Sequence, residues 1–374
     1  MTGRRPVGVL GGSGVVGRAA AAALRGLGVG PLRLGGRRPE AVAAAAAALP
    51  GGPAEAVVVD LADAGSLAAF CAGCSTVLNC AGPSYQVKGR VALAALAAGA
   101  DYVDVAGDDP AYEQLRGAGL ATLGRSAVLS AGLLPGLSGL LPRWLAGQRP
   151  GEGGRLTVWA GGLERCSRTV AADLVLSLGG GPAEPPFGEP LAAWRDGRRA
   201  GRALRAEDAA QLPYFPGEVA LQPYLSTEAE RLAVALGLAG LDWYNVFPGR
   251  RVRAVLASLA GGRAPLDDAA GRLVRAAELD LTGRRPYYRM VFALDSPAGA
   301  VTAVLGTGDS YRVTAAVGAL AVAATLAGEV PAGLHYAAEV LDPGAAVRRI
   351  AATPGVTLDV SYGPAELTDV VGAL

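Results

Sequence analysis

A glycine-rich stretch near the N-terminus has the residue types and spacing of a phosphate-binding turn. Residues 7–17 read VGVLGGSGVVG, and Gly12, Gly14 and Gly17 satisfy the pattern G-x-G-x-x-G. The first glycine permits a tight turn, the second lets backbone approach a pyrophosphate, and the third lets helix and strand pack closely. Unpaired amides at the start of the next helix then receive the phosphates. The stretch predicts dinucleotide binding, with contacts from Gly11, Gly12, Ser13, Gly14, Val15 and Gly17.

Two arginines stand where a site that prefers NAD carries an acidic residue. Such a residue is expected about 20 positions beyond the glycines, and Arg37 and Arg38 occupy that place instead. A guanidinium group pairs with a 2′-phosphate through its fork geometry and its charge. The pair therefore favours NADP(H), and the alternative is a solvated arginine pair in an arginine-rich protein.

Three polar residues near the expected crevice could transfer a proton. Lys88 is the single lysine of the chain, and in a helix after Pro83 its ammonium could contact the ribose or polarise the substrate. Tyr85 could donate its phenolic proton or pack on the nicotinamide. Asp104 could act in catalysis or cap a neighbouring loop. For Lys88 the alternative is an ordinary surface position.

Further cofactor contacts are expected where predicted strands end. Asp60 follows the third strand, at a position that often borders the adenine. Asn79 is expected to hold the loop after the fourth strand through bonds to the backbone, with cofactor contact as a second role. The same loop supplies three more expected contacts: Ala81, Gly82 and Pro83.

Candidate substrate-binding residues lie in the second half of the chain. Glu164, Arg165 and Arg168 follow a predicted strand and a glycine turn, where they could hold an amino or carboxylate group. The alternative is a solvated turn. Tyr224 precedes a predicted helix and could line the pocket or belong to the core.

No metal site is expected. Cys71 and Cys74 form a C-x-x-C, but no second pair accompanies them at zinc-site spacing. His335 is the only histidine, and it falls in a predicted helix at 335–340. We interpret the four cysteines as buried thiols of a protein in the reducing cytoplasm.

The elements that position these residues alternate regularly through the first 150 residues. Hydrophobic runs predict six strands separated by helices, which imply a parallel sheet with right-handed crossovers, the doubly wound α/β Rossmann fold. The expected strand order is 3-2-1-4-5-6, with the ligand crevice at the carboxyl ends of strands 1 and 4. The strands are predicted at 7–10, 32–34, 56–59, 76–78, 102–105 and 127–129, and the helices at 18–24, 87–98 and 112–123.

Beyond residue 150 strands and helices follow in mixed order. A capping box of Thr227 and Glu230 predicts the start of one helix, and 287–294 with 300–305 reads as a hairpin. This mixture predicts a second, α+β substrate domain. The expected division is a Rossmann dinucleotide-binding domain at 1–150, joined by C-terminal helices at 311–352, and the substrate domain at 151–310.

Composition limits the class of partner. The 34 basic and 33 acidic residues give a formal charge of +1, which supplies no field of one sign for nucleic acid or a membrane surface. The apolar run 313–328 is shorter than the roughly 18 to 20 residues that span a bilayer, so a buried helix is expected. We expect a small-molecule substrate, no targeting segment and no membrane span, and the oligomeric state is left open, a homodimer included.

Four successive motifs resemble the saccharopine dehydrogenase-like NAD(P)-dependent oxidoreductases. They are VLGGSGVVG at the start, LNCAGP up to Pro83, AGADYVDVAGD at 98–108 and SAGLLPGLSGLL at 130–141. The resemblance implies a Rossmann domain with an inserted substrate domain and hydride transfer at the cleft. Better-known members act on imines that join two amino-acid-like pieces, while a lipid-associated branch comprises trans-acting enoyl reductases. A histidine acid cannot be carried over, because no histidine lies near the cleft-facing loops.

We therefore expect a cytoplasmic NADPH-dependent oxidoreductase that reduces an imine (C=N) of an amino-acid-like substrate. One alternative is a trans-acting enoyl (C=C) reductase for a lipid or carrier-bound acyl group. Another is a non-catalytic NADP-sensing protein, because a glycine fingerprint indicates binding and not turnover.

Overall fold

The computed structural model describes residues 4–178, 188–259 and 264–363 and divides into two compact units. The first unit comprises the chain up to Leu140 together with Ser310–Thr353. The second begins at Leu141, ends at Asp309 and takes up the chain again from Pro354. The chain therefore passes between the units three times.

The first unit is built on a seven-stranded sheet, counted over the described residues, in which every pairing is parallel. Its order is β16-β6-β5-β4-β1-β2-β3, so the predicted order of six strands is confirmed and β16 is added beside β6. The strands are short apolar runs, as sheets covered on both faces require. They are β1 Val7–Leu10, β2 Leu32–Gly36, β3 Glu55–Val58, β4 Thr76–Asn79, β5 Asp101–Asp104, β6 Ser126–Leu129 and β16 Gly333–Tyr336.

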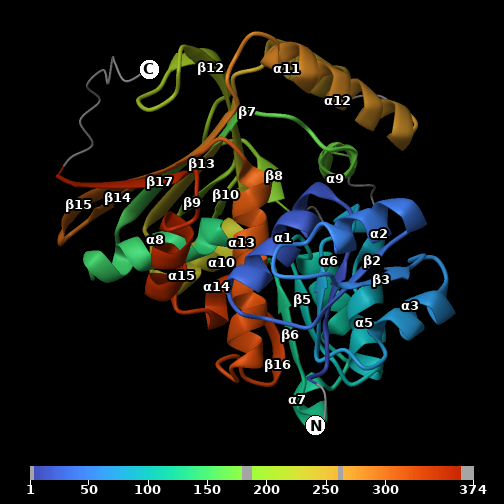
Figure 1. Ribbon diagram of the computed structural model, residues 1–374. Helices are drawn as coiled ribbons and strands as arrows, with labels where there is room; N and C mark the ends of the chain where they lie inside the picture. The colour runs from blue at the N-terminus through green and yellow to red at the C-terminus, as the bar shows by residue number, and fades with distance from the viewer. Residues whose placement is uncertain (1–3, 179–187, 260–263, 364–374) are drawn as a thin grey trace. The chain divides into compact units, whose positions relative to one another are not determined.

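Helices cover this sheet on opposite faces. Helix α13 packs along α1 and also contacts β4 and β5, whereas α5 contacts the same two strands and packs with α3 (Figure 1). The expected buried helix is thus α13, in which Gly318 lies against the sheet: an added Cβ would be 2.7 Å from Val105 Cγ1. The helices are α1 Val15–Gly26, α2 Pro39–Ala47, α3 Ala64–Cys71, α4 Ser84–Val87, α5 Arg90–Ala97, α6 Asp109–Leu115, α7 Leu120–Leu123, α13 Ser310–Leu326, α14 Ala337–Val340 and α15 Pro343–Ala351, and α8 Leu137–Gln148 begins in this unit and continues into the second.

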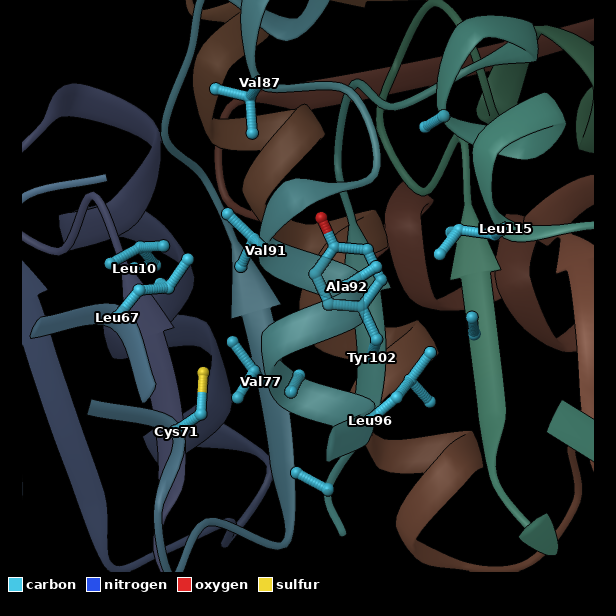
Figure 2. Close-up of a cluster of buried hydrophobic side chains, with 14 of the residues drawn as sticks. Leu10, Leu67, Cys71, Val77, Val87, Val91, Ala92, Leu96, Tyr102 and Leu115 are labelled. Atoms are coloured by element: carbon cyan, nitrogen blue, oxygen red, sulfur yellow. The ribbon is translucent and has the colours of Figure 1, made fainter. Parts of the chain in front are cut away.

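The core between the sheet and α3, α5 and α6 is mainly aliphatic, and its buried aromatic residues are Phe70, Tyr102 and Tyr336. Figure 2 shows the Tyr102 ring among Val91, Ala92, Leu96 and Leu115. Tyr102 has no exposed surface, so its hydroxyl requires a partner inside the protein.

The second unit is built on a ten-stranded mixed sheet with four helices, counted over the described residues. β7 pairs in parallel with β13 and antiparallel with β14, and the predicted hairpin is β14 and β15. The α+β class is confirmed. The strands are β7 Arg155–Leu163, β8 Gly188–Pro190, β9 Ala193–Arg195, β10 Arg198–Ala200, β11 Glu207–Gln211, β12 Glu218–Ser226, β13 Gly240–Phe247, β14 Tyr287–Ser296, β15 Gly299–Thr307 and β17 Val356–Tyr362; the helices are α9 Arg168–Leu178, α10 Thr227–Ala235, α11 Arg250–Leu259 and α12 Leu266–Leu281.

Four local predictions are wrong. The helix expected at 112–123 is interrupted, because α6 ends at Leu115 and α7 covers only Leu120–Leu123. The helix expected at 87–98 is α5, which begins only at Arg90 because the backbone breaks at Lys88 between it and α4. His335 lies in β16 and not in a helix. The residue that caps α10 is Ser226, whose Oγ accepts from Ala229 N at 3.1 Å, while Glu230 pairs with Arg199.

Within the described part of the chain, no helix combines the length and the apolar character that a membrane crossing requires.

Candidate cofactor and active site

The glycine turn between β1 and α1 is held by backbone packing and hydrogen bonds. Gly12 N donates to Gly35 O at 2.9 Å, and Gly14 N donates to Gly11 O at 2.8 Å. A Cβ on Gly17 would lie 2.2 Å from Gly11 O, so only glycine fits where the helix approaches the strand. Helix α1 starts at Val15 without a side-chain cap. Its first amides are therefore left for an anionic ligand.

The end of β2 carries the expected arginines beside the glycine turn. Arg37 and Arg38 are exposed, and their side chains form no hydrogen bond or ion pair with any described residue. Arg38 is the N-cap of α2, again without a side-chain cap. Ser13 Oγ lies 3.2 Å from the position that a Cβ on Gly36 would take. The serine hydroxyl therefore lies beside the residue that directly precedes Arg37 and Arg38. Two cations and a hydroxyl suit a phosphate monoester.

A cavity of about 440 Å³ lies between α3 and α5, beside the turn that follows β3. Asp60 begins this turn, where its Oδ1 accepts from Ala62 N at 2.9 Å. Arg90 Nη1 donates to Leu61 O at 3.3 Å and brings a cation to the rim. Arg90 was not among the expected site residues. The lining is Leu61, Ala62, Ala64, Leu67, Arg90 and Ala94.

A buried polar network joins the carboxyl ends of β4 and β5. Asp104 Oδ2 accepts from Asn79 Nδ2 at 2.9 Å and from the Tyr102 hydroxyl at 2.5 Å. Asp104 Oδ1 accepts from Ala106 N at 2.9 Å and from Gly107 N at 2.7 Å. The carboxylate is 2% exposed and has two donors on each oxygen. Hydrogen bonds alone offset its burial, because no basic side chain among the described residues forms an ion pair with it.

The network extends into the loops around it. Asn79 Oδ1 accepts from Ala81 N at 3.1 Å, which fixes the loop after β4 as expected. The same loop touches the glycine turn, because a Cβ on Gly11 would lie 2.8 Å from Cys80 O. On the other side, Ser130 N after β6 donates to Gly107 O at 2.7 Å. One carboxylate is thus connected to the loops after β4, β5 and β6.

Proton donors inside the network stay protonated at neutral pH. Burial, with the Asp104 carboxylate as the second cause, raises the pKa of the Tyr102 hydroxyl well above its ordinary value. The same two causes raise the pKa of the Cys80 thiol. Tyr102 was not predicted as a site residue, although the alternation in Asp101–Asp104 puts it on the same face of β5 as Asp104.

Lys88 and Tyr85 lie directly after Pro83, at the carboxyl end of β4. Tyr85 belongs to α4, a single helical turn, and Lys88 ends that turn with φ +48°, a conformation that costs free energy for a residue with a Cβ. Lys88 N donates to Ser84 O at 2.8 Å. Both side chains are half-buried. Lys88 is therefore not one or two turns inside a helix, as expected, but on a strained corner.

In the second unit, Glu164 and Arg165 follow β7, and Arg168 is the first residue of α9. Burial raises the pKa of Cys166 to about 11, and the Glu164 carboxylate contributes. Burial and then Glu164 also raise the pKa of the Tyr288 hydroxyl. Glu164 is thus flanked by two protonated groups, neither of which was expected at the site. Arg168 Nη2 pairs with Asp267 at 3.4 Å on the surface.

Tyr224 does not lie with this group. It belongs to β12, where its neighbour Pro223 pairs with Tyr244, and Tyr244 pairs with Trp159 of β7. Trp159 lies five residues before Glu164, so Tyr224 is at least about 17 Å from Glu164 along the strands. Its ring packs on Gly188, because a Cβ there would be 2.6 Å from Tyr224 Cε1.

Metal-ligating residues do not gather in the described ranges: no three His, Cys, Asp or Glu side chains are arranged to hold an ion. The four cysteines are free thiols, with Cys71 and Cys74 buried. His335 Nε2 lies 3.0 Å from Pro331 O.

The N-terminal part of the chain matches a known protein family. Residues 7–120 match the family model described as saccharopine dehydrogenase NADP binding domain. The search of curated proteins found no match.

One solved structure matches the fold over nearly the whole chain. Saccharopine dehydrogenase (L-Glu forming) from Saccharomyces cerevisiae matches with a TM-score of 0.65 and 15% identity, covering 96% of this chain and 100% of that one. A myo-inositol dehydrogenase from Corynebacterium glutamicum gives a TM-score of 0.47 and 11% identity, covering 93% and 94% of the two chains. The first likeness establishes the fold.

Proposed function

We propose that this chain, a saccharopine dehydrogenase-like oxidoreductase that uses NADP(H), transfers hydride from NADPH to the C=N bond of an imine with an amino-acid-like component. The observation that carries the proposal is the match of residues 7–120 to the saccharopine dehydrogenase NADP-binding domain. That match confirms the predicted family resemblance and the cofactor. The glycine turn, with uncapped α1 amides beside it, fits a pyrophosphate, and the exposed arginines after β2 fit a 2′-phosphate.

The nicotinamide supplies the hydride, so the protein must orient the cofactor and donate a proton. We assign the proton donor to Lys88, with Tyr85 as the second candidate, because both are half-buried at the carboxyl end of β4. Asp104 is better suited to positioning than to proton transfer, since four donors already occupy its two oxygens. In the second unit we keep Glu164 and Arg165 as candidate ligands of an amino or carboxylate group.

We retain the proposed division of labour along the chain. The first unit, up to Leu140 together with Ser310–Thr353, acts as the cofactor domain, and the second unit acts as the substrate domain. The substrate is a small molecule, and the free thiols agree with a cytoplasmic location.

The reaction is tested by following NADPH absorbance with three sets of substrates. The first set mixes an amino acid with an oxo acid or aldehyde, so that an imine forms in solution. The second contains enoyl thioesters, and the third contains each carbonyl compound without an amine. We expect NADPH consumption that requires amine and carbonyl together, with deuterium from 4-deuterated NADPH found on the new C–N carbon.

Other results would overturn the proposal in distinct ways. Consumption with enoyl thioesters alone would assign the chain to C=C reduction. Tight NADPH binding without turnover on any set would support a sensing protein. The Gly14→Ala variant serves as the control for background oxidation, because it is expected to fold and to bind the cofactor roughly ten- to a hundredfold more weakly.

A further inference from the structure

We propose that Tyr102 is a positioning residue for the cofactor: through Asp104 and Asn79 it holds the loops that receive the nicotinamide half. The inference rests on NADP(H) binding and is independent of which bond the enzyme reduces. Tyr102 lies on β5 and has no exposed surface. Its effect on the ligand must therefore pass through other groups.

The Tyr102 side chain has two separable roles. Its ring fills the core among Val91, Ala92, Leu96 and Leu115 (Figure 2), a role that phenylalanine would serve equally well. Its hydroxyl donates to Asp104 Oδ2 at 2.5 Å. Packing alone therefore does not explain a tyrosine here.

The second donor to Asp104 Oδ2 is the side chain that shapes the loop after β4. Asn79 Nδ2 donates to this oxygen at 2.9 Å, and with the amide held in that orientation Asn79 Oδ1 accepts from Ala81 N at 3.1 Å. The other carboxylate oxygen holds Ala106 N and Gly107 N after β5. Tyr102, Asn79 and two backbone amides thus fix one carboxylate, and the carboxylate fixes two loops.

These loops belong to one half of the cofactor site. In a doubly wound sheet of this order, β1 to β3 bind the adenosine half, and β4 to β6 form the second mononucleotide-binding half. The arginines after β2 and the turn at Asp60 lie outside the network, whereas Ala81, Gly107 and Ser130 are joined to it. Loosening the network should therefore affect the nicotinamide half and spare the adenosine half.

The test compares two ligands on one variant. Calorimetry measures the Kd of NADPH and of adenosine 2′,5′-bisphosphate, which lacks the nicotinamide half, for the parent protein and for Tyr102→Phe. We expect the Kd of NADPH to rise at least about fivefold while that of the bisphosphate changes less than about twofold. Ile350→Val is the matched control, because it destabilises the core of the same unit and leaves the network intact.

Two outcomes would overturn the inference. Equal weakening of both ligands would mean that Tyr102 acts through general stability, and unchanged binding of both would mean that the hydroxyl positions nothing. If Tyr102→Phe does not fold, Asp104→Asn gives the same comparison, because its amide nitrogen opposes the Asn79 donor while its oxygen can still accept from Ala106 and Gly107.

Discussion

Replacing Gly14 by alanine separates cofactor binding from folding. A Cβ on Gly14 would meet only Gly11 O, at 3.1 Å, and ordinary contact begins at 3.4 Å. Gly14 also has φ −74°, which suits any residue. The turn has to yield by a few tenths of an ångström, so the variant should fold. The new methyl group occupies space that a pyrophosphate needs. Losing one amide contact to a charged group costs about 1.5–3 kcal/mol, or roughly ten- to a hundredfold in Kd.

The contrast with Gly17 sharpens this prediction. A Cβ on Gly17 would lie 2.2 Å from Gly11 O and 2.9 Å from Gly12 Cα, and both atoms are backbone that cannot rotate away. Overpacking of this kind costs about 3 kcal/mol, the upper end of its usual range. At about 2–4 °C per kcal/mol, Gly17→Ala should lower Tm by about 6–12 °C.

Calorimetric titration with NADPH and thermal melting of each variant check both statements. Gly26→Ala is the matched control in the same helix, because nothing lies within 4 Å of its added Cβ. It should bind NADPH like the parent and melt no lower. If Gly14→Ala folds and binds NADPH with the parent Kd, the assignment of this turn to the pyrophosphate is wrong.

Three further changes probe the remaining assignments. Replacing Arg37 and Arg38 by alanine should abolish a preference for NADPH over NADH, since each phosphate contact contributes about 1.5–3 kcal/mol; equal Kd values for the two cofactors in the parent would contradict this. Lys88→Arg should lower kcat at least tenfold, about 1.4 kcal/mol, with unchanged Tm, and Lys88→Met should lower it further; a parental kcat for Lys88→Arg would make Tyr85 the donor to test. Burial raises the pKa of Cys71 from 9.0 to about 12 and that of Tyr102 well above 10.0, so at alkaline pH the folded chain keeps protons that the unfolded chain releases. Denaturant titrations should therefore show that the free energy of unfolding falls as pH rises above 9.0 and 10.0, the ordinary pKa values of cysteine and tyrosine. Each group contributes a loss of up to about 1.4 kcal/mol per pH unit, and a flat profile would rule this out.

The first unit was largely predictable because its strands are short apolar runs, several of which end at or directly before Gly, Asn or Asp. A buried parallel strand needs such a run, and crossover handedness then leaves few strand orders. Val7–Leu10 and Thr76–Asn79 follow this pattern, and both were placed within one residue of their observed bounds. The loop-fixing role of Asn79 was predictable for a related reason, because its amide follows a strand end where backbone groups lack partners.

The elements that were missed depend on long-range pairing. Strand β16 has four residues and pairs with β6, about 200 positions earlier in the chain, so local periodicity carries little signal. The break at Lys88 was missed because Val87 before it and the Val, Ala and Leu residues after it fit a continuous helix. Tyr102 was missed because an aromatic residue in an apolar strand is indistinguishable from core until a carboxylate is found at its hydroxyl.

The late return of α13 and β16 to the first sheet has a consequence for biosynthesis. Both elements complete this unit, yet they follow Leu140 only after the 169 residues that end at Asp309. Closing a loop of that length costs about 4–5 kcal/mol of chain entropy if the intervening residues are unstructured. When β6 has just left the ribosome, the sheet of this unit is therefore not yet covered by α13. The side of α1 that will contact α13 is then still accessible to chaperones. Folding of the intervening residues before α13 emerges would lower this entropic cost, so the order of translation favours completing the cofactor-binding unit after most of the second unit, which then lacks only β17 of its described elements.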